Sequence, residues 1–290
     1  MAPFVESNDI PADDDASRSR ADRDGYLFLR DFVDREPILE AQRDIAATLQ
    51  DVGWIDAGTD PCAAKTSHPA RIAGTDEHKP VYDRVQKLES RHTLAHNDAL
   101  FRIARALLGP DVLLQPSNIA RFIFPTGLDY PTPPHQDYVH AQGTPDVGTA
   151  WLPPDDCPHK LGGLSLQTDS HRVGVLPVSR ALGAGGLRTH TEGVAGEWLS
   201  SPFGPGDVLI FHSHTVHQGL PNLSSDRLRL SVDFRYQKAA DPVMAKMLAP
   251  LQYRLSWSEV YADWKSDKYQ FYWKKFPLRP VPKQVWPIEN

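Results

Sequence analysis

The stretch Pro133-Pro134-His135-Gln136-Asp137-Tyr138 organises the rest of the chain. His135 and Asp137 are two residues apart, and side chains at that spacing on a β-strand point to the same face. An imidazole and a carboxylate placed side by side can bind one metal ion. A third ligand from a distant strand, for which we expect His217, would complete a set of two histidines and one carboxylate. Such a set leaves coordination positions open and suits non-haem Fe(II) and oxygen chemistry.

A second polar pair lies further along the chain, in Arg229-Leu230-Ser231. Arg229 and Ser231 share a strand face, so a guanidinium and a hydroxyl can bind one carboxylate together. A buried arginine without a partner is costly, so an arginine in a barrel strand argues for an anionic ligand. A metal triad beside a carboxylate clamp is what a 2-oxoglutarate-dependent oxygenase needs, because its co-substrate binds iron at one end and carries a second carboxylate at the other.

Length and composition narrow the class of protein. The 290 residues suffice for one large β-rich domain, and a net charge of −6 without a dense basic block argues against a nucleic-acid partner. No apolar run reaches about 18 residues, so we expect no membrane span, and the N-terminus lacks an apolar signal segment. Cys62 and Cys157 are far apart in sequence. A reducing cytoplasm is therefore the simpler expectation for the localisation.

The pattern predicts one domain over residues 23–290, preceded by a polar lead-in at 1–22 that we expect to be disordered. Residues 23–111 are predicted to be largely helical, and 238–290 to form a helical, aromatic extension. From 112 to 237, Gly, Pro and Asp recur every 8–12 residues, which is typical of an all-β sandwich or barrel. The predicted strands are 25–30, 112–124, 134–140, 147–152, 163–168, 173–177, 207–211, 215–219 and 228–236, and the helices of the N-terminal part are 37–52, 83–92 and 96–108.

Two segments have no clear periodicity. Residues 53–82 form a long loop, which we interpret as a lid or an insertion. Residues 178–200 form a Gly-rich insertion with a doubtful short strand near 187–191. Loops of this kind shape pockets in many enzymes, so we expect both segments to shape the substrate pocket.

Further motifs accompany the two polar pairs. They are Asp24-Gly25-Tyr26, Ala150-Trp151, Gly162-Gly163-Leu164, the run from Ser170 to Gly174, Gly206-Asp207-Val208, Val216-His217 with Asn222 and Ser224, and Tyr236. As a set over about residues 24–237, they resemble the phytanoyl-CoA dioxygenase (PhyH) family of Fe(II)/2-oxoglutarate-dependent oxygenases. The resemblance implies a mainly β fold with flanking helices around a double-stranded β-helix (jelly-roll, cupin-like) core. It also implies Fe(II) as the metal, with 2-oxoglutarate and O2 as co-substrates.

The resemblance implies that His135, Asp137 and His217 are the catalytic iron ligands. His212 and His214 compete for the distal place. His217 is preferred because, as in the family, it precedes a Gln-Gly and Asn stretch and lies at the right distance from the arginine that follows.

The co-substrate contacts are carried over in the same way. Arg229 matches the arginine that binds the C5-carboxylate of 2-oxoglutarate, and Ser231 lies beside it. Arg227 is the rival, because the loop after His217 is one residue longer than we expect, but Arg229 keeps a seven-residue step to Tyr236.

Three other residues are predicted to contact the co-substrate. Trp151 matches an aromatic residue that packs beside it, and Thr149 shares the strand face of Trp151. Asn118 is placed to hydrogen-bond 2-oxoglutarate, although a structural role for Asn118 is an equal alternative. Residues that could face the substrate are Arg121, Tyr138 and His140.

We therefore expect an Fe(II)/2-oxoglutarate-dependent dioxygenase that hydroxylates an unactivated C–H bond of a small metabolite or natural-product intermediate while 2-oxoglutarate is decarboxylated to succinate. Desaturation, cyclisation or epoxidation with the same cofactors stays an alternative. A cupin-like protein that binds a metal or ligand without turnover is the alternative of another class, and a zinc hydrolase would not need the carboxylate clamp. The family name suggests an acyl-CoA substrate, whereas the lack of a concentrated basic patch favours a smaller one. The sequence leaves the substrate and the oligomeric state open.

Overall fold

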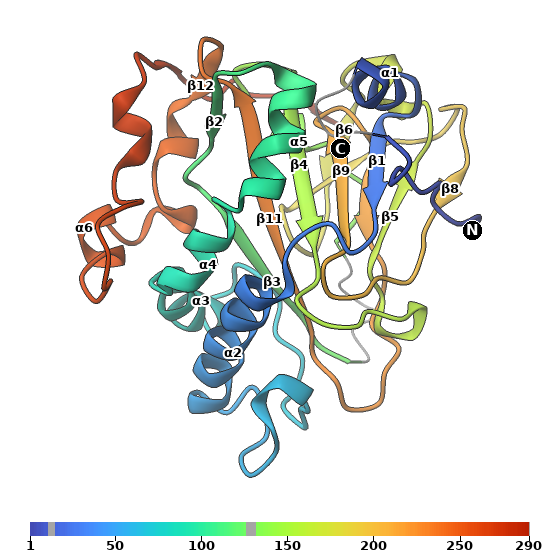
Figure 1. Ribbon diagram of the computed structural model, residues 1–290. Helices are drawn as coiled ribbons and strands as arrows, with labels where there is room; N and C mark the ends of the chain where they lie inside the picture. The colour runs from blue at the N-terminus through green and yellow to red at the C-terminus, as the bar shows by residue number, and fades with distance from the viewer. Residues whose placement is uncertain (11–14, 126–131, 290) are drawn as a thin grey trace.

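Two β-sheets form the centre of the protein, as seen in a computed structural model that describes residues 1–10, 15–125 and 132–289 (Figure 1). The larger sheet has the strand order β1-β9-β4-β11-β2, and β3 pairs with the first half of β11; the smaller sheet has the order β10-β5-β8. The strands of the larger sheet are β1 (Tyr26–Leu29), β2 (Val112–Leu114), β3 (Ile119–Ile123), β4 (Val147–Leu152), β9 (Val208–His212) and β11 (Arg229–Lys238). Those of the smaller sheet are β5 (Leu164–Gln167), β8 (Trp198–Leu199) and β10 (His217–Gly219).

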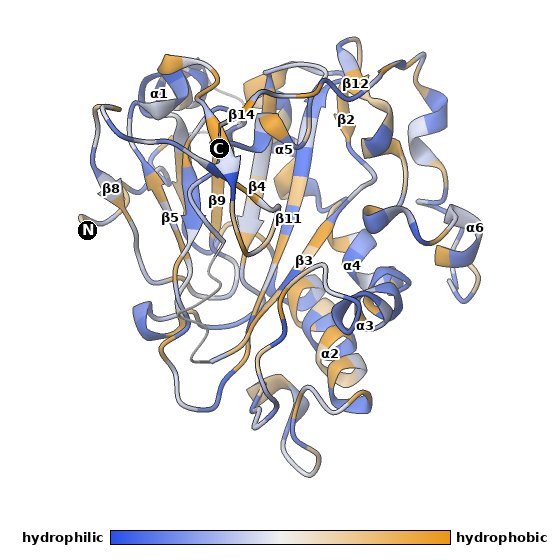
Figure 2. Cartoon of the chain, turned by 180° about the vertical axis from the view of Figure 1, so that it is seen from behind, coloured by the Kyte–Doolittle hydropathy of each residue, from blue (hydrophilic) through white to orange (hydrophobic). Residues whose placement is uncertain are grey.

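Strand β11 explains how the larger sheet separates an apolar layer from a polar interior. Polar and apolar residues alternate along it, visible as bands in Figure 2, and alternate side chains of a strand point to opposite faces. Leu230, Val232 and Phe234 join the apolar core formed with the helices. The residues on the opposite face, toward the smaller sheet, are Arg229, Ser231, Asp233 and Arg235.

The helices lie against the outer face of the larger sheet (Figure 1). They are α2 (Arg35–Asp51), α3 (His78–Gln86), α4 (Glu89–Leu94) and α5 (Asp98–Leu108). The helix predicted at 83–92 is in fact two short helices, because Leu88 between them is extended (φ −69°, ψ 116°). This mainly β core with flanking helices confirms the predicted fold class. Among the described residues, every helix is too short or too polar to span a membrane.

The strand predicted at 134–140 is wrong. His135 makes a single β-bridge with His217, and a 3-10 turn follows at Asp137–Val139. Pro133 and Pro134 have no N–H group to donate, so no ladder can extend before His135. The strand predicted at 173–177 is also absent; β6 (Val178–Arg180) begins just after it and pairs with β7 (Leu187–Thr189), inside the Gly-rich insertion.

The lead-in differs from the disorder expected of it. Phe4 is buried among Tyr26, Phe28 and Phe203, with ring centroids 5.2–6.0 Å apart. Helix α1 (Asp15–Asp24) follows and packs beside β1. The polar composition of the lead-in predicted disorder because it gives little weight to a single aromatic residue. The buried ring of Phe4 nevertheless anchors this short segment to the core. Residues 11–14 lie outside the described residues.

The C-terminal extension is aromatic as predicted but not largely helical. It consists of short elements, namely β12 (Pro242–Met244), the four-residue α6 (Trp257–Val260), β13 (Arg279–Val281), β14 (Ile288–Glu289) and 3-10 turns. Its large side chains bury one another in a separate apolar cluster that includes Val260, Tyr261 and Trp273. Mutual packing of rings, rather than helix formation, therefore holds this segment.

One histidine of this region predicts how stability depends on pH. His96 stacks on Tyr269 with ring centroids 4.0 Å apart, and burial, with Lys275 and Lys268 nearby, lowers the pKa of His96 to about 3. In the unfolded chain, His96 binds a proton as the pH falls through about 6.5, whereas in the folded chain it stays neutral. The contribution of neutral, buried His96 to the free energy of unfolding is therefore fully present above about pH 6.5. The contribution falls by about 1.4 kcal/mol per pH unit below that value.

Replacing His96 with phenylalanine keeps the ring and removes this titration. The free energy of unfolding in urea should then fall by about 1 kcal/mol less between pH 7.5 and 5.5 than it does in the unmodified protein. His159→Phe, at an exposed position, is the matched control and should leave the pH dependence unchanged. An unchanged pH dependence in His96→Phe would contradict the prediction.

Candidate metal and co-substrate site

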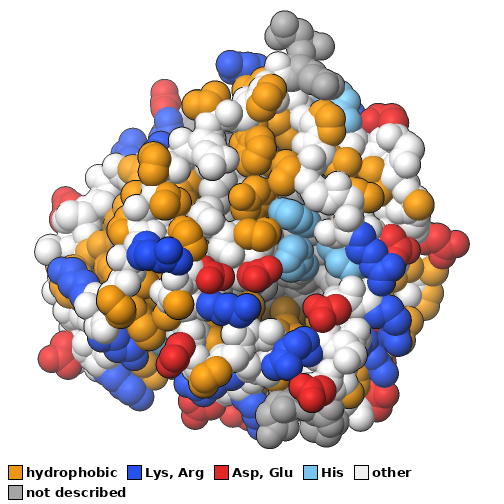
Figure 3. Space-filling model, turned by 90° about the horizontal axis from the view of Figure 1, so that it is seen from above, with side chains coloured by type: hydrophobic (Ala, Val, Ile, Leu, Met, Phe, Trp, Pro, Cys, Tyr) orange, Lys and Arg blue, Asp and Glu red, His pale blue; other side chains and the backbone are white. Residues whose placement is uncertain are grey.

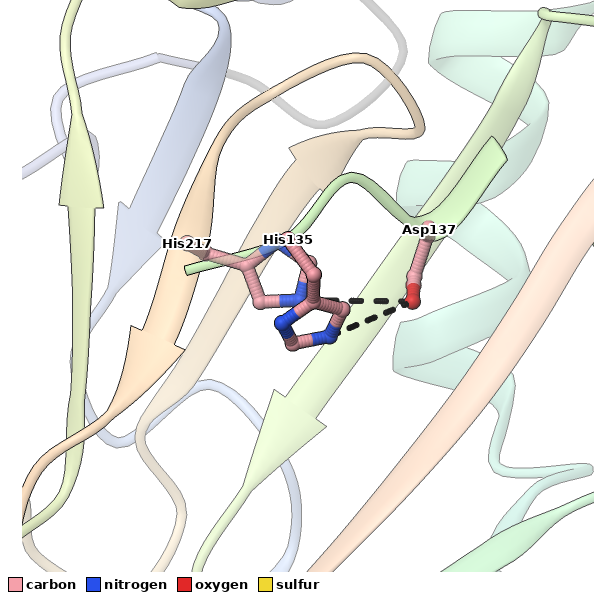
Figure 4. A group of neighbouring side chains, drawn as sticks. All are labelled: His135, Asp137 and His217. Atoms are coloured by element: carbon pink, nitrogen blue, oxygen red, sulfur yellow. Dashed lines mark ion pairs between the residues drawn. The ribbon is translucent and has the colours of Figure 1, made fainter. Parts of the chain in front are cut away.

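The three predicted metal ligands meet between the two sheets (Figure 4). His217 opens β10, and His135 lies beside it through the isolated β-bridge. Oδ1 of Asp137 lies 3.9 Å from Nε2 of His135 and 4.0 Å from Nε2 of His217. All three side chains are buried, with one ligand atom of each within 4.8 Å of the others. Although no strand runs through 135–137, Gln136 is extended (φ −110°, ψ 132°), so the spacing still brings both side chains to one side.

The backbone fixes which nitrogen each imidazole presents. Nδ1 of His135 donates to the carbonyl of Pro133 at 2.8 Å, and Nδ1 of His217 donates to that of Thr215 at 2.9 Å. The Nε2 lone pair of each ring therefore faces the triad, as in protein metal sites. Burial lowers the pKa of both histidines, which keeps them neutral and able to bind a metal.

Asp137 is braced by two side chains of the larger sheet. Arg235 donates from Nη2 to Oδ1 at 2.8 Å and from Nε to Oδ2 at 3.1 Å. The hydroxyl of Thr149 donates to Oδ2 at 2.6 Å. Burial alone would raise the pKa of Asp137, but Arg235 and the two histidines outweigh it and hold the pKa well below its usual range. Oδ2 is thus occupied, and Oδ1 is the atom that faces the imidazoles.

A small inner cavity joins the triad to the predicted carboxylate clamp. The residues lining it include His135, Asp137, His217, Trp151 and Arg229. Three buried polar groups of this lining have an atom without a hydrogen-bond partner among the described residues: Nε of Arg229, Nε1 of Trp151 and the hydroxyl of Thr132. The hydroxyl of Ser231 also lacks a partner there, but Ser231 is not among the residues that line this cavity. Buried donors without partners are rare in proteins, so these groups fit a polar ligand.

Arg229 is held so that part of its guanidinium remains free. Its Nη1 donates to the carbonyl of Gly163 at 2.9 Å, and the guanidinium carbon lies 5.8 Å from the Trp151 ring centroid. The adjacent Gly162 has φ +96°, and a Cβ there would lie 2.6 Å from the carbonyl oxygen of Leu220, so only glycine allows this close approach. Arg229 is 1% exposed, and burial lowers the pKa of its guanidinium.

The structure separates the predicted residues from their rivals. Arg227 pairs with Asp155 at a partly exposed position and does not line the inner cavity. His214 lies edge-on to the ring of Tyr138, with centroids 4.9 Å apart, and His212 lines a different hollow, beside α1. Of these candidates, Arg229 and His217 are the ones that line the inner cavity, and their roles stay predictions.

Two predicted co-substrate contacts lie differently from what we expected. The Thr149 hydroxyl donates its hydrogen bond to Oδ2 of Asp137, so it orients this predicted metal ligand. Asn118 precedes β3, its Oδ1 has no partner among the described residues, and it is not among the residues that line the inner cavity. Contacts of either residue with 2-oxoglutarate stay predictions.

An outer cavity of about 350 Å³ adjoins the triad. It shares His135, Asp137 and Arg121 with the inner cavity. Its wall comes from β3 and from segments far apart in sequence: Ala73, Gly74 and His78 of the long loop and α3, Ala184 and Gly185 of the Gly-rich insertion, and Met244, Lys246, Met247, Leu251 and Lys283 of the C-terminal extension. The two unpatterned loops thus border the space next to the metal site.

Sequence reasoning missed the ion pairs of this site. Arg121 donates from Nε to Oδ2 of Asp233 at 2.8 Å, and Arg235 forms a second arginine–aspartate pair with Asp137. The signal was present, because residues 229, 231, 233 and 235 are all polar on a strand whose intervening residues are apolar. Such an alternation predicts a polar interior face, although it does not give the partners.

Comparison with known proteins agrees with this geometry. Residues 21–230 match the family described as phytanoyl-CoA dioxygenase (PhyH). The chain is similar to 1-deoxypentalenic acid 11-beta-hydroxylase of Streptomyces exfoliatus, with 28% identity over 83% of this chain and 87% of that protein. It is also similar to the protein of the same name from Streptomyces arenae, with 29% identity over 76% of this chain and 79% of that one.

Solved structures share the fold. The epimerase SnoN in complex with Fe3+, alpha ketoglutarate and nogalamycin RO has a TM-score of 0.56 at 20% identity, over 78% of this chain and 84% of that one. The carbocyclase SnoK from nogalamycin biosynthesis has a TM-score of 0.52 at 18% identity, over 82% of this chain and 88% of that one. The family match over most of the chain places the assembled triad in a known context: this chain belongs to the phytanoyl-CoA dioxygenase (PhyH) family of Fe(II)/2-oxoglutarate-dependent oxygenases.

Proposed function

We propose that this protein is an Fe(II)/2-oxoglutarate-dependent dioxygenase that hydroxylates a C–H bond of a small metabolite or natural-product intermediate, with 2-oxoglutarate decarboxylated to succinate. One observation carries the proposal: a buried triad of two histidines and one carboxylate lines the same inner cavity as Arg229, a buried arginine that has no anionic partner among the described residues. His135, Asp137 and His217 would hold Fe(II), which when bound activates O2 at positions that the protein leaves open.

The remaining residues of the inner cavity bind and orient the co-substrate. Arg229, with Ser231 beside it on β11, supplies the charge and the hydrogen bonds that a distal carboxylate needs. Trp151 packs beside the guanidinium and offers its unpartnered indole N–H. The outer cavity holds the substrate, and the short path between the two cavities at His135 and Asp137 brings the substrate C–H next to the metal position.

The names of the curated relatives favour hydroxylation. Both are described as hydroxylases of 1-deoxypentalenic acid, and they cover most of this chain. Desaturation, cyclisation or epoxidation would use the same residues and stays the alternative outcome. Product analysis by mass spectrometry separates hydroxylation from desaturation and cyclisation, because a hydroxylated product gains one oxygen atom and a desaturated or cyclised product loses two hydrogen atoms. Epoxidation of an alkene also adds one oxygen atom, so NMR of the product distinguishes an epoxide from an alcohol.

The first test is binding without oxygen. Addition of Fe(II) and 2-oxoglutarate to metal-free protein should produce the weak visible charge-transfer band of chelated 2-oxoglutarate. Arg229→Ala should weaken 2-oxoglutarate binding by about 10- to 150-fold, because a hydrogen bond to a charged group contributes roughly 1.5–3 kcal/mol. The titration of the band with 2-oxoglutarate gives this ratio directly.

Arg227→Ala is the matched control. It also removes an arginine side chain, but Arg227 lies two residues before Arg229 and forms a partly exposed ion pair with Asp155. Its titration should follow that of the unmodified protein. If folded, metal-loaded protein gives no band, the oxygenase proposal fails and the jelly roll is a binding module. If Arg227→Ala, rather than Arg229→Ala, weakens the band, the co-substrate arginine is Arg227.

A further inference from the structure

The outer cavity has an apolar body. On β3, Ile119 and Ile123 are the half-exposed residues of a strand whose other apolar residues are buried, and both line the cavity. The C-terminal extension adds Met244, Met247 and Leu251. Burial of a hydrocarbon skeleton against such side chains is favourable by about 25 cal/mol for each Å² removed from water, so the lining selects an apolar scaffold.

The charges on the lining do not balance. Arg121 is paired with Asp233, and Arg235 is paired with Asp137. Lys246 and Lys283 also line the cavity, and neither has an ion pair within the part of the chain that the structure describes. No acidic residue other than Asp137 lines this cavity among the described residues. Basic and acidic side chains are interspersed over the face seen in Figure 3, and the whole chain has a net charge of −6.

Both lysines are exposed and lie at the rim of the cavity. The ammonium of Lys246 lies 5.0 Å from the ring centroid of Tyr253, another residue of the cavity wall. Lys283 precedes Gln284, whose backbone N–H donates to Oε1 of Gln142 at 2.6 Å and whose carbonyl accepts from Nε2 of Gln142 at 3.0 Å. This paired contact fixes the chain next to Lys283 at the edge of the cavity.

Two histidines of the outer cavity offer hydrogen bonds. Nδ1 of His78 and Nε2 of His140 are buried and have no partner among the described residues. The basic side chains of this lining that have no ion pair among the described residues are Lys246 and Lys283, because Arg121 and Arg235 are already paired.

We infer that the substrate is an apolar carboxylic acid, with its hydrocarbon body against β3 and the C-terminal extension and its carboxylate at Lys246 and Lys283. This inference rests on the proposed function and names the substrate class of that site. It gives the C-terminal extension, which the family match at residues 21–230 does not cover, a role in substrate selection. A phosphate of an acyl-CoA is the other anion that two lysines would attract, and the test separates the two sources.

The test is calorimetric binding to the full-length protein loaded with Fe(II) and 2-oxoglutarate in the absence of oxygen. The probes are decanoic acid and 1-deoxypentalenic acid, the methyl ester of each, and decanoyl-CoA. Each acid should bind about three- to tenfold more tightly than its neutral ester, because two exposed lysines each form a weak ion pair with the same carboxylate. Decanoyl-CoA should bind no more tightly than decanoic acid.

Charge-reversal variants locate the carboxylate. Lys246→Glu and Lys283→Glu should each weaken binding of the acids by about threefold or more and leave binding of the esters within about twofold. Lys160→Glu makes the same charge change at an exposed position outside the cavity and should leave both unchanged. The charge-transfer band formed before the probe is added should be the same in all three variants.

The two proposals fail in different ways. A missing band without any probe overturns the proposed function, and calorimetry on the metal-free protein then still tests the cavity. If neither acid binds more tightly than its ester, or if Lys246→Glu and Lys283→Glu bind the acids as the unmodified protein does, the carboxylate inference is wrong. Tighter binding of decanoyl-CoA than of decanoic acid also overturns it, in favour of a CoA thioester.

Discussion

Replacing Asp137 with alanine should reduce 2-oxoglutarate-dependent oxygen consumption to below detection. The variant lacks the carboxylate that lies 3.9 and 4.0 Å from the two imidazole Nε2 atoms, so the metal loses one of three protein ligands. The loss should exceed the roughly 10- to 100-fold that follows when a group supporting a metal ligand is removed. An oxygen electrode and a metal-binding titration with Fe(II) or Co(II) measure the two effects. Asp156→Ala removes an exposed carboxylate and serves as the control with full activity.

Asp137→Ala also leaves the buried guanidinium of Arg235 without its partner, so lost activity could come from unfolding. The double variant Asp137→Ala/Arg235→Met removes both charges, and replacing a buried ion pair by apolar residues is often neutral or stabilising. We expect the double variant to unfold at about the same denaturant concentration as the unmodified protein and still to consume no oxygen. Activity at the unmodified level in either variant would refute the assignment of Asp137 as a ligand.

Replacing Arg235 alone with methionine should destabilise the metal-free protein by about 3–5 kcal/mol, because it leaves the Asp137 carboxylate buried and unpaired. Arg235 is 4% exposed and donates to both carboxylate oxygens. A bound metal ion offers the same carboxylate a cation, so saturation with Co(II) should restore more stability to Arg235→Met than it adds to the unmodified protein. Urea unfolding with and without Co(II) measures both quantities.

Arg121→Met is the matched control for this effect. Arg121 pairs with Asp233 at 2.8 Å in a similar buried setting, but Asp233 is not a member of the triad. This variant should lose stability without any extra recovery on metal addition. Equal metal-dependent recovery in the two variants would show that Arg235 and the metal do not share Asp137.

The sequence by itself determined which side chains are candidates for the site, and their chemical roles stay predictions. The step from His135 to Asp137, the later His217, and Arg229 with Ser231 on an alternating strand were enough to predict a metal triad and a carboxylate clamp. These features are local, because one extended residue or one strand period sets the direction of each side chain. The same reason explains why the β-rich core and the outer helices could be predicted from periodicity, although 134–140 was assigned as a strand and proved to be a bridge and a turn.

Only the tertiary structure decided which groups surround that site. Arg235 reaches Asp137 across 98 positions of sequence, and Thr149 reaches it across 12, so no local pattern assigns either to the metal ligand. The outer cavity likewise takes its wall from the long loop, the Gly-rich insertion and the C-terminal extension, which was expected to be helical but consists of short elements with one four-residue helix. Side-chain direction depends on neighbouring residues in the chain, whereas partners, burial and cavity shape depend on which distant segments pack together, and that is settled only when the whole chain folds.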